Sequence, residues 1–303
     1  MKRFTFISLA LTSLSLVAFA AETIRFEPIV GTITKYRTTI QTTTEIQNSS
    51  ITTSDGQPVP KAFENLLELL KASLNSTQTQ DITEKIVSLD ANGARQLETT
   101  ILQSSQATAI GFEMRSSVTP DGRLTISNFK FDAATAAQPG ISALGDSFLT
   151  AMQNLYAQQY PNIYGQALNP LQSLKFSSNS QDSIRAIFTS LPDAKIQIEG
   201  LQNNLEYIYQ GRNASNDHVF KVAGNTTAGS FVAELSGIRL EQRTGGSLLE
   251  GEIVYLADGR LKSSRQSAGQ LQTQIQSINL GQQTLTISLT AKTNSVSSTQ
   301  ILP

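Results

Sequence analysis

The stretch IGFEMRSSVTPDGRLTISNFKF, residues 110–131, decides the fold class of this chain. Every second residue of its first nine is apolar or small, which is the pattern of an extended segment with one buried face. Proline and glycine at 120–122 then favour a tight turn. Alternation resumes after the turn and changes parity, which predicts a β-bulge near 127–128. We therefore predict a β-hairpin over residues 108–131.

A second hairpin of the same design is predicted over residues 247–266. Its turn reads ADGRL at 257–261, against PDGRL at 120–124. This likeness fits an internal duplication, and it also fits the general frequency of Asp-Gly in hairpin turns. Alternation predicts further strands, with Thr and Gln on a wetted second face. They are expected at 23–29, 32–46, 79–90, 93–104, 194–200, 203–211, 217–223, 229–242, 269–278 and 284–292.

Two segments change from the period of a strand to the period of a helix. Leucines and Phe63 recur at helical spacing over residues 60–74, after a proline that suits a first helical turn. Residues 141–158 repeat this pattern after Pro139-Gly140. Such amphipathic helices either cover a sheet as core elements or form a lid over a cavity.

The expected fold is therefore mainly β: a long curved antiparallel sheet, arranged as a half-barrel or as two related β halves, covered by two amphipathic helices. Residues 158–182 are rich in Gln, Asn, Tyr, Pro and Ser, and they are predicted to be an irregular connector. The connector separates an N-terminal β half with both helices, residues 22–160, from a C-terminal β half, residues 183–303. The two halves are also compatible with one continuous sheet.

The first residues read as a cleavable secretory signal over residues 1–21. Lys2 and Arg3 precede an apolar run to Phe19, and Ala18 and Ala20 suit the narrow subsites of a signal peptidase. The alternative is a membrane anchor, but the run is shorter than the roughly 20 residues of a stable span. No later segment is long and apolar enough, so no transmembrane helix is expected after cleavage.

The amino-acid composition limits the cellular location and the kinds of partner that can be expected. The chain has no cysteine, which is unusual for a secreted animal or plant protein of this size and favours a bacterial envelope protein. We therefore expect a periplasmic or extracellular location. Without the basic residues of the signal, 21 basic residues stand against 24 acidic ones, a net charge of −3. This charge is too small and of the wrong sign to attract nucleic acid.

No arrangement of residues predicts catalysis. The single histidine, His218, cannot build an imidazole metal site, and no cysteine can replace the missing ligands. Ser127 and Lys130 have the spacing of penicillin-binding enzymes, but they fall in a predicted strand. Glu250 and Glu252 share a strand face without the aromatic residues typical of a sugar site. We therefore predict a non-enzymatic protein with no cofactor and no metal.

The hairpins 108–131 and 247–266, together with the helices 60–74 and 141–158, resemble the periplasmic lipoprotein-carrier superfamily (LolA-type and LppX-type half-barrels). The resemblance implies an apolar ligand, such as a lipid, in a cavity between helices and sheet. The ligand-binding residues that it implies all lie on the two helices: Phe63, Leu67, Leu70, Leu144, Phe148 and Met152.

The leading hypothesis is thus an exported envelope protein that binds an apolar ligand. The alternative is a structural or protein-interaction module of the bacterial cell surface, with an envelope protein as its partner. An outer-membrane barrel fits the alternation, but the two helices and the low aromatic content of 7% argue against it.

Overall fold

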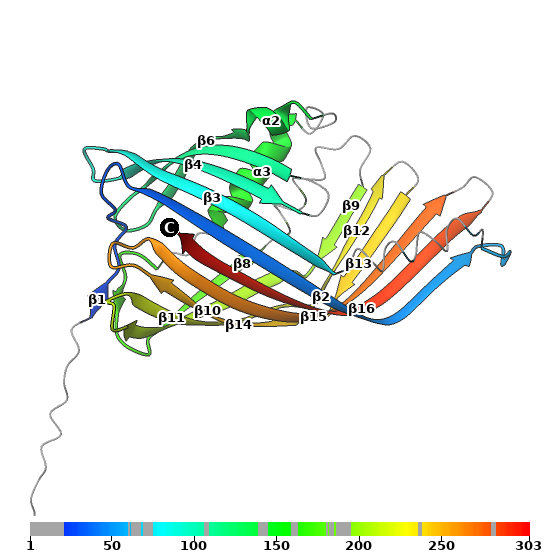
Figure 1. Cartoon of the computed structure of the whole chain (residues 1–303). Helices are drawn as coiled ribbons and strands as arrows, with labels where there is room; N and C mark the ends of the chain where they lie inside the picture. The colour runs from blue at the N-terminus through cyan, green and yellow to red at the C-terminus, as the bar shows by residue number, and fades with distance from the viewer. Residues whose placement is uncertain are drawn as a thin grey trace, which may run out of the picture.

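The computed structural model describes residues 21–59, 75–105, 109–138, 145–158, 163–179, 195–235, 238–279 and 283–303, with isolated positions at 61, 68, 181 and 185. The described chain is mainly β and forms a large antiparallel sheet that is not closed (Figure 1). A separate pair of short strands, β1 (Glu22–Thr23) and β7 (Ala167–Leu168), lies near one end of it.

The large sheet has 14 strands, most of them connected in sequence order. Its members are β2 (Ile33–Thr53), β3 (Ser76–Leu89), β4 (Arg95–Ser104), β5 (Ala109–Val118), β6 (Leu124–Phe131), β8 (Ser173–Asn179), β9 (Lys195–Glu199), β10 (Gln202–Arg212), β11 (His218–Thr226), β12 (Gly229–Leu235), β13 (Ile238–Thr244), β14 (Ser247–Tyr255), β15 (Leu261–Asn279) and β16 (Thr284–Leu302).

Three long strands, β2, β16 and β15, form the centre of the sheet. On one side, β3 pairs with the first half of β2 and continues into β4, β5 and β6. On the other side, β14 pairs with the first half of β15 and continues into β11, β10 and β8. The second half of β15 pairs instead with β13, which leads to β12 and β9. Strands from both sides of the predicted connector therefore belong to one sheet.

The hairpin predicted over residues 108–131 is confirmed as β5 and β6. Arg115 pairs with Asn128 and Ser116 pairs with Ile126, so Ser127 is the extra residue of the predicted bulge. The second predicted hairpin is present as β14 and β15.

Several predicted boundaries were wrong. The supposed connector contains β8, whose sequence SLKFSSN carries only two large apolar residues. The predicted strand 229–242 is two strands, β12 and β13. The strand expected over 23–29 pairs only at Glu22–Thr23, and the residues after it bond to loops.

The helices are described in part. The observed part of the predicted helix 141–158 is α3 (Gly145–Gln158). The predicted helix 60–74 lies outside the described residues, apart from Lys61 and Glu68. A short helix that was not predicted, α2 (Ala133–Ala136), follows β6, and the Asp132 side chain caps it by accepting from the Thr135 amide. No helix in the described segments has both the length and the apolar character needed to cross a membrane.

A core shared by distant strands shows that the sheet is curved. One cluster of buried residues joins Leu97 and Val118, from β4 and β5, to Tyr207 and Phe220, from β10 and β11. These strand groups are separated in the sheet by β3, β2, β16, β15 and β14. The same face of both flanks must therefore turn inward, and we call it the concave face.

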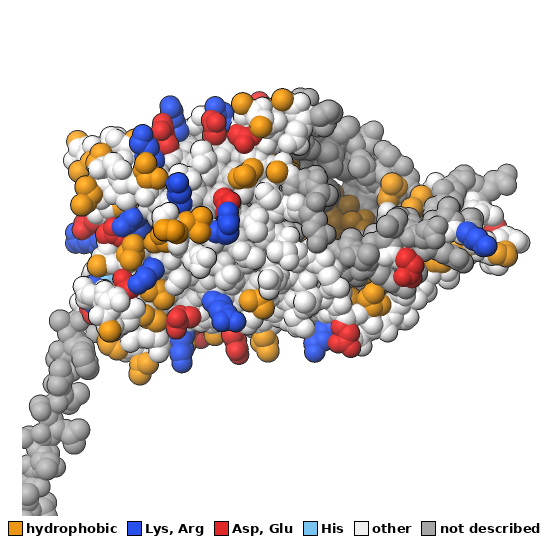
Figure 2. Space-filling view, in the orientation of Figure 1, with side chains coloured by type: hydrophobic (Ala, Val, Ile, Leu, Met, Phe, Trp, Pro, Cys, Tyr) orange, Lys and Arg blue, Asp and Glu red, His pale blue; other side chains and the backbone are white. Residues whose placement is uncertain are grey.

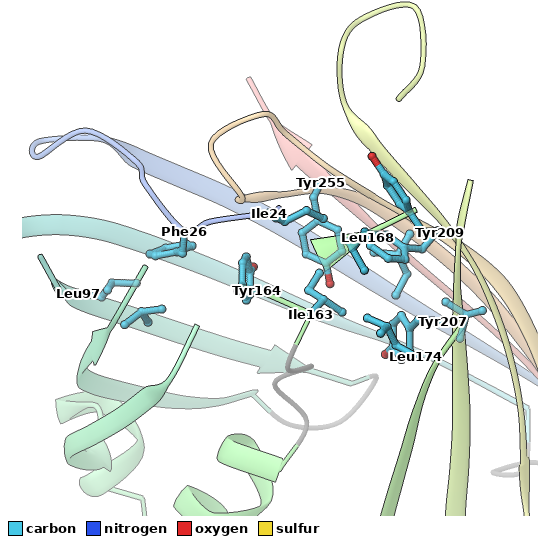
Figure 3. Packing of buried hydrophobic residues seen from close by; sticks show 14 of the residues in the cluster. Ile24, Phe26, Leu97, Ile163, Tyr164, Leu168, Leu174, Tyr207, Tyr209 and Tyr255 are labelled. Carbon is cyan, nitrogen blue, oxygen red and sulfur yellow. The ribbon is translucent and has the colours of Figure 1, made fainter. Parts of the chain in front are cut away.

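Two segments far apart in sequence fill the space between the flanks, and we call them the plug: residues 22–28 and 163–168. Figure 3 shows Phe26, Tyr164 and Ile163 of the plug between Leu97 on one side and Tyr207 on the other. The Phe26 ring meets the Tyr164 ring edge to face, at 6.1 Å between centroids. The plug therefore fixes the distance between the two flanks.

The two similar Asp-Gly turns hold the plug from both sides. The Phe26 amide donates to the carbonyl of Pro120 at 3.1 Å, and the Glu27 amide donates to that of Asp258 at 2.9 Å. The Tyr164 hydroxyl donates to the Gly259 carbonyl at 2.8 Å. Gly122 and Gly259 both adopt positive φ, so the shared turn sequence provides two matching contacts for one inserted segment.

We predict that alanine at either turn glycine destabilises the protein beyond the cost of the positive φ. A Cβ on Gly259 would lie 2.2 Å from the Arg25 carbonyl oxygen, and one on Gly122 would lie 2.3 Å from the Tyr164 ring. Gly56 also has a positive φ, +70°, but nothing lies within 4 Å of its Cβ position. Gly56→Ala should cost about 1 kcal/mol. Gly122→Ala and Gly259→Ala should each cost about 2 kcal/mol more, measured by urea unfolding. Equal losses at all three positions would contradict the clamping of the plug.

Candidate binding surface on the concave face

The concave face is defined by the strand register. Along β16, Leu285, Ile287 and Leu289 lie on this face, and the intervening threonine and serine residues point to the opposite, convex face. Cross-strand pairing then assigns the faces of the other strands. The plug occupies one end of the concave face, which we call the plugged end. The end formed by β9, β12, β13, the second halves of β15 and β2, and the first half of β16 is the distal end (Figure 1).

At the distal end the concave face carries aliphatic residues of β16, β2 and β13 beside the inward Gln272, Gln274 and Gln276 of β15. Leu285 and Ile287 of β16 are buried. Their cross-strand neighbours Ile278 and Ile51 are partly buried. On β13, Ile238 faces the same way and is 43% exposed. The apolar surface at this end is therefore accessible at Ile238, whereas Leu285 and Ile287 are covered. The space-filling view shows a hollow in the molecule with hydrophobic side chains inside it (Figure 2).

The predicted ligand-binding residues that the structure describes pack on the concave face. Phe148 of α3 stacks on Phe131 of β6, with ring centroids 6.0 Å apart. Met152 packs against the cluster formed by Ile101, Phe112, Met114 and Phe129. Phe63, Leu67, Leu70 and Leu144 lie outside the described residues. Of the two roles considered for these helices, the contacts of Phe148 and Met152 are those of a helix covering a sheet.

A carboxyl group interrupts the apolar residues near the plugged end. Glu84 of β3 lies on the concave face, between Ile82 and Ile86. Burial raises the pKa of the Glu84 carboxyl to about 7, although the hydrogen bond from the Tyr36 hydroxyl and the charge of Arg260 act in the opposite direction. Arg260 also donates to Thr34, the cross-strand neighbour of Glu84, at 2.9 Å. This carboxyl can therefore change its charge near neutral pH.

Two buried hydroxyl groups lie close to Glu84 in the sheet. Thr99 pairs with Glu84, and Ser116 pairs with Leu97, two residues before Thr99. Both residues are 2% exposed, and neither side-chain oxygen has a hydrogen-bond partner in the described structure. Buried hydroxyls are normally bonded, so these two are exceptions within the described structure.

Glu84 and Thr99 were not predicted as site residues, although the sequence contains a signal for them. Glu84 has the same parity as Ile82 and Ile86, and Thr99 has the same parity as Leu97 and Ile101. A polar residue at an inward position of an alternating strand indicates a buried polar group.

His218 is the first residue of β11 and belongs to a network that anchors β1. The Tyr209 hydroxyl bonds to His218 Nδ1 at 3.0 Å and to the Glu22 carboxylate at 3.1 Å. Burial and the charge of Arg212 lower the pKa of His218 to about 4. Burial alone would raise the pKa of Glu22, but the hydrogen bond from Arg212 holds it below its usual value. Beside this network, Lys262 pairs with the buried Asp217 at 2.6 Å.

The convex face carries exposed ion pairs, among them Arg37 with Asp81 at 2.7 Å and Lys130 with Glu113 at 2.9 Å. Exposed pairs of this kind contribute little to stability. A depression of about 350 Å³ lies among such residues, including Glu98, Arg115 and Lys130. No group of three or more His, Cys, Asp or Glu side chains suited to a metal occurs in the part of the chain that the structure describes.

Comparison with known proteins finds no relative: no protein-family model matches the chain, and no curated protein matches it. The function must therefore be argued from the molecule itself.

We predict that Glu84 makes the protein less stable as the pH rises through neutrality. The folded pKa of about 7 exceeds the ordinary glutamate value of 4.5, so the folded state holds the proton more tightly. The associated stability is complete below about pH 4.5 and is lost as the pH rises through about 7. Glu84→Gln should flatten this part of the profile and stabilise the protein at pH 8 by about 2 kcal/mol. Urea unfolding between pH 5 and 8 measures this.

The control is Glu98→Gln, which changes an exposed carboxyl on the convex side of the adjacent strand. It should leave the pH profile of the wild-type protein unchanged. A Glu84→Gln profile parallel to the wild-type profile would contradict the role assigned to Glu84.

Proposed function

We propose that the protein is an exported, non-catalytic protein of the bacterial envelope that binds an apolar ligand, such as a lipid, on the concave face of its sheet. The observation that carries the proposal is the accessible aliphatic surface at the distal end, with Ile238, Leu240 and Ile278 on one inward face. Apolar area left accessible inside a curved surface favours occupation by another apolar group.

The plug supports the same proposal because it fills only the plugged end of the concave face and not the distal end. Residues 22–28 and 163–168 fill the concave face between β4, β5, β10 and β11. The second half of β15 and the first half of β16 extend beyond these contacts toward β9, β12 and β13. One end of the face is therefore a protein core, and the other end is the candidate binding surface. A periplasmic or extracellular location, which the predicted signal favours, is part of the proposal.

The ligand itself is the first test. Protein purified from its native host without detergent should release lipid into organic solvent, detected by mass spectrometry. The protein should also bind the apolar probe N-phenyl-1-naphthylamine saturably, with an increase in fluorescence. An empty extract together with no saturable probe binding would contradict the proposed function.

Two leucine substitutions, one on each face of the sheet, test where the probe binds. Leu240→Gln puts a polar group on the concave face of β13, and it should weaken probe binding about tenfold by removing part of the apolar contact. Leu271→Gln makes the same change on the convex face of the neighbouring strand β15, where Leu271 is 50% exposed, and it should have no effect. Equal effects of the two substitutions would place the probe elsewhere.

A structural or protein-interaction module of the cell surface is the second candidate, and a patch on the convex face favours it. Leu248, Leu271 and Val296 are 73%, 50% and 38% exposed. Their strands bring them together around Gly269, since Leu248 pairs with Gly269 and Val296 pairs with Ser267. A photo-crosslinking residue at position 248 should capture an envelope protein on intact cells, and recovery of none would count against this candidate.

A further inference from the structure

Charge is distributed very unevenly between the two faces of the large sheet. The described strands place almost all of their Lys, Arg, Asp and Glu residues on the convex face, as the register and the exposed ion pairs show. The exceptions on the concave face are Glu84, Arg95, Arg212 and Lys262. All four lie toward the plugged end, and each has a protein partner. Glu84 bonds to Tyr36, and Arg95 bonds to the carbonyls of Pro28 and Gly93. Arg212 pairs with Glu22, and Lys262 pairs with Asp217.

Between the plugged end and the distal end, the concave face is uncharged and mostly polar, with Ile40 and Ala268 among the polar residues. We call this region the neutral belt, and it includes Thr42, Gln78, Gln266, Gln270, Ser295 and Ser297. These residues come from β2, β3, β15 and β16, and all are partly exposed. A concave face built only to fill a core would carry Val, Ile or Leu at these inward positions.

Hydroxyl groups of the neutral belt can form hydrogen bonds beyond those they make to each other. Thr42 bonds to Ser295 at 3.2 Å, and Thr38 bonds to Thr299 at 2.9 Å. A hydroxyl group has one donor and two acceptor positions, so such a pair leaves positions free for another molecule.

A charged ligand group would be poorly accommodated there. Transfer of a phosphate or carboxylate out of water is costly unless an opposite charge meets it, and the described part of the belt contains no cation. An uncharged ester, hydroxyl or amide costs much less and is satisfied by the donors and acceptors of Thr, Ser and Gln. The neutral belt therefore favours uncharged ligand groups over charged ones.

We propose that the concave face takes an electrically neutral amphiphile, whose hydrocarbon lies on the distal aliphatic surface and whose uncharged polar groups bond to the neutral belt. This inference rests on the proposed function and specifies its ligand class: acylated molecules with ester, hydroxyl or amide groups and no phosphate or carboxylate.

Two fluorescent probes with identical acyl chains test it on the full mature protein. One is a labelled diacylglycerol, which is neutral, and the other is the corresponding phosphatidic acid, which is anionic. The neutral probe should bind at least about tenfold more tightly. If the anionic probe binds as well or better, neutral selection is wrong and apolar binding stands. If neither probe binds, the proposed function itself fails.

Neighbouring serines on β16 supply matched variants. Ser297→Lys places a cation in the neutral belt, whereas Ser298→Lys places it on the exposed convex face one residue away. Ser297→Lys should raise the relative affinity for phosphatidic acid about tenfold or more, because the anion gains a partner. Ser298→Lys should leave the selectivity unchanged, and equal effects of both variants would overturn the assignment to the belt.

A second pair of variants provides the same test if Ser297→Lys does not fold. Thr42→Lys and Thr43→Lys repeat the comparison on β2, where Thr42 faces inward and Thr43 is exposed. Circular dichroism and thermal melting identify which variants remain folded, and either folded inward variant suffices for the comparison.

Discussion

The packing of the plug between the two flanks of the sheet is the constraint on which the rest of the structure depends. Hydrogen bonds between antiparallel strands set their spacing, but they do not make β4 and β10 approach each other across the concave face. Phe26, Ile163 and Tyr164 do so, because they bury the inward side chains of both flanks at once. Each large side chain removed from water in this way contributes about 2 kcal/mol. Curvature is therefore fixed by side-chain packing, with the two Asp-Gly turns holding the inserted segment.

Local chemistry made the hairpins predictable. Alternation and the turn at 120–122 lie within one short stretch, and the change of parity around Ser127 located the bulge. The plug could not be found in this way. Its contacts join residues 22–28 to residues 163–168 and to two distant turns, and nothing in either segment specifies that partner. The expected strand over 23–29 was wrong because the same extended residues form hydrogen bonds to loops.

The ends of the long strands were underestimated because alternation of hydropathy disappears there. In β16 the pattern is clear from Leu285 to Ala291, where the prediction stopped at 292, and the strand continues to Leu302. Beyond Ala291 the inward residues are Thr293, Ser295, Ser297 and Thr299, which a hydropathy pattern cannot distinguish from a wetted face. The polar residues that made the strand look shorter in the sequence therefore form part of the neutral belt.

Helical spacing was ambiguous for another reason: it shows that Phe148 and Met152 share a face, but not whether that face meets a sheet or a ligand.

A neutral belt is a costly way to build a concave face if stability were its only purpose. Inward Ser, Thr and Gln side chains bury less apolar area than Val or Leu, and each must keep its polar atoms bonded. Solubility does not require them, because the charged residues of the convex face already provide it. The opposite pattern holds at the plugged end, where aromatic residues pack closely and the few inward charges are paired. Polar groups that are retained where packing would favour aliphatic ones, next to an accessible aliphatic surface, match a ligand that is itself part polar and part apolar. This correspondence between the surface and a neutral amphiphile does not depend on any likeness to a known carrier, since it follows from the register of four strands and the placement of their charges.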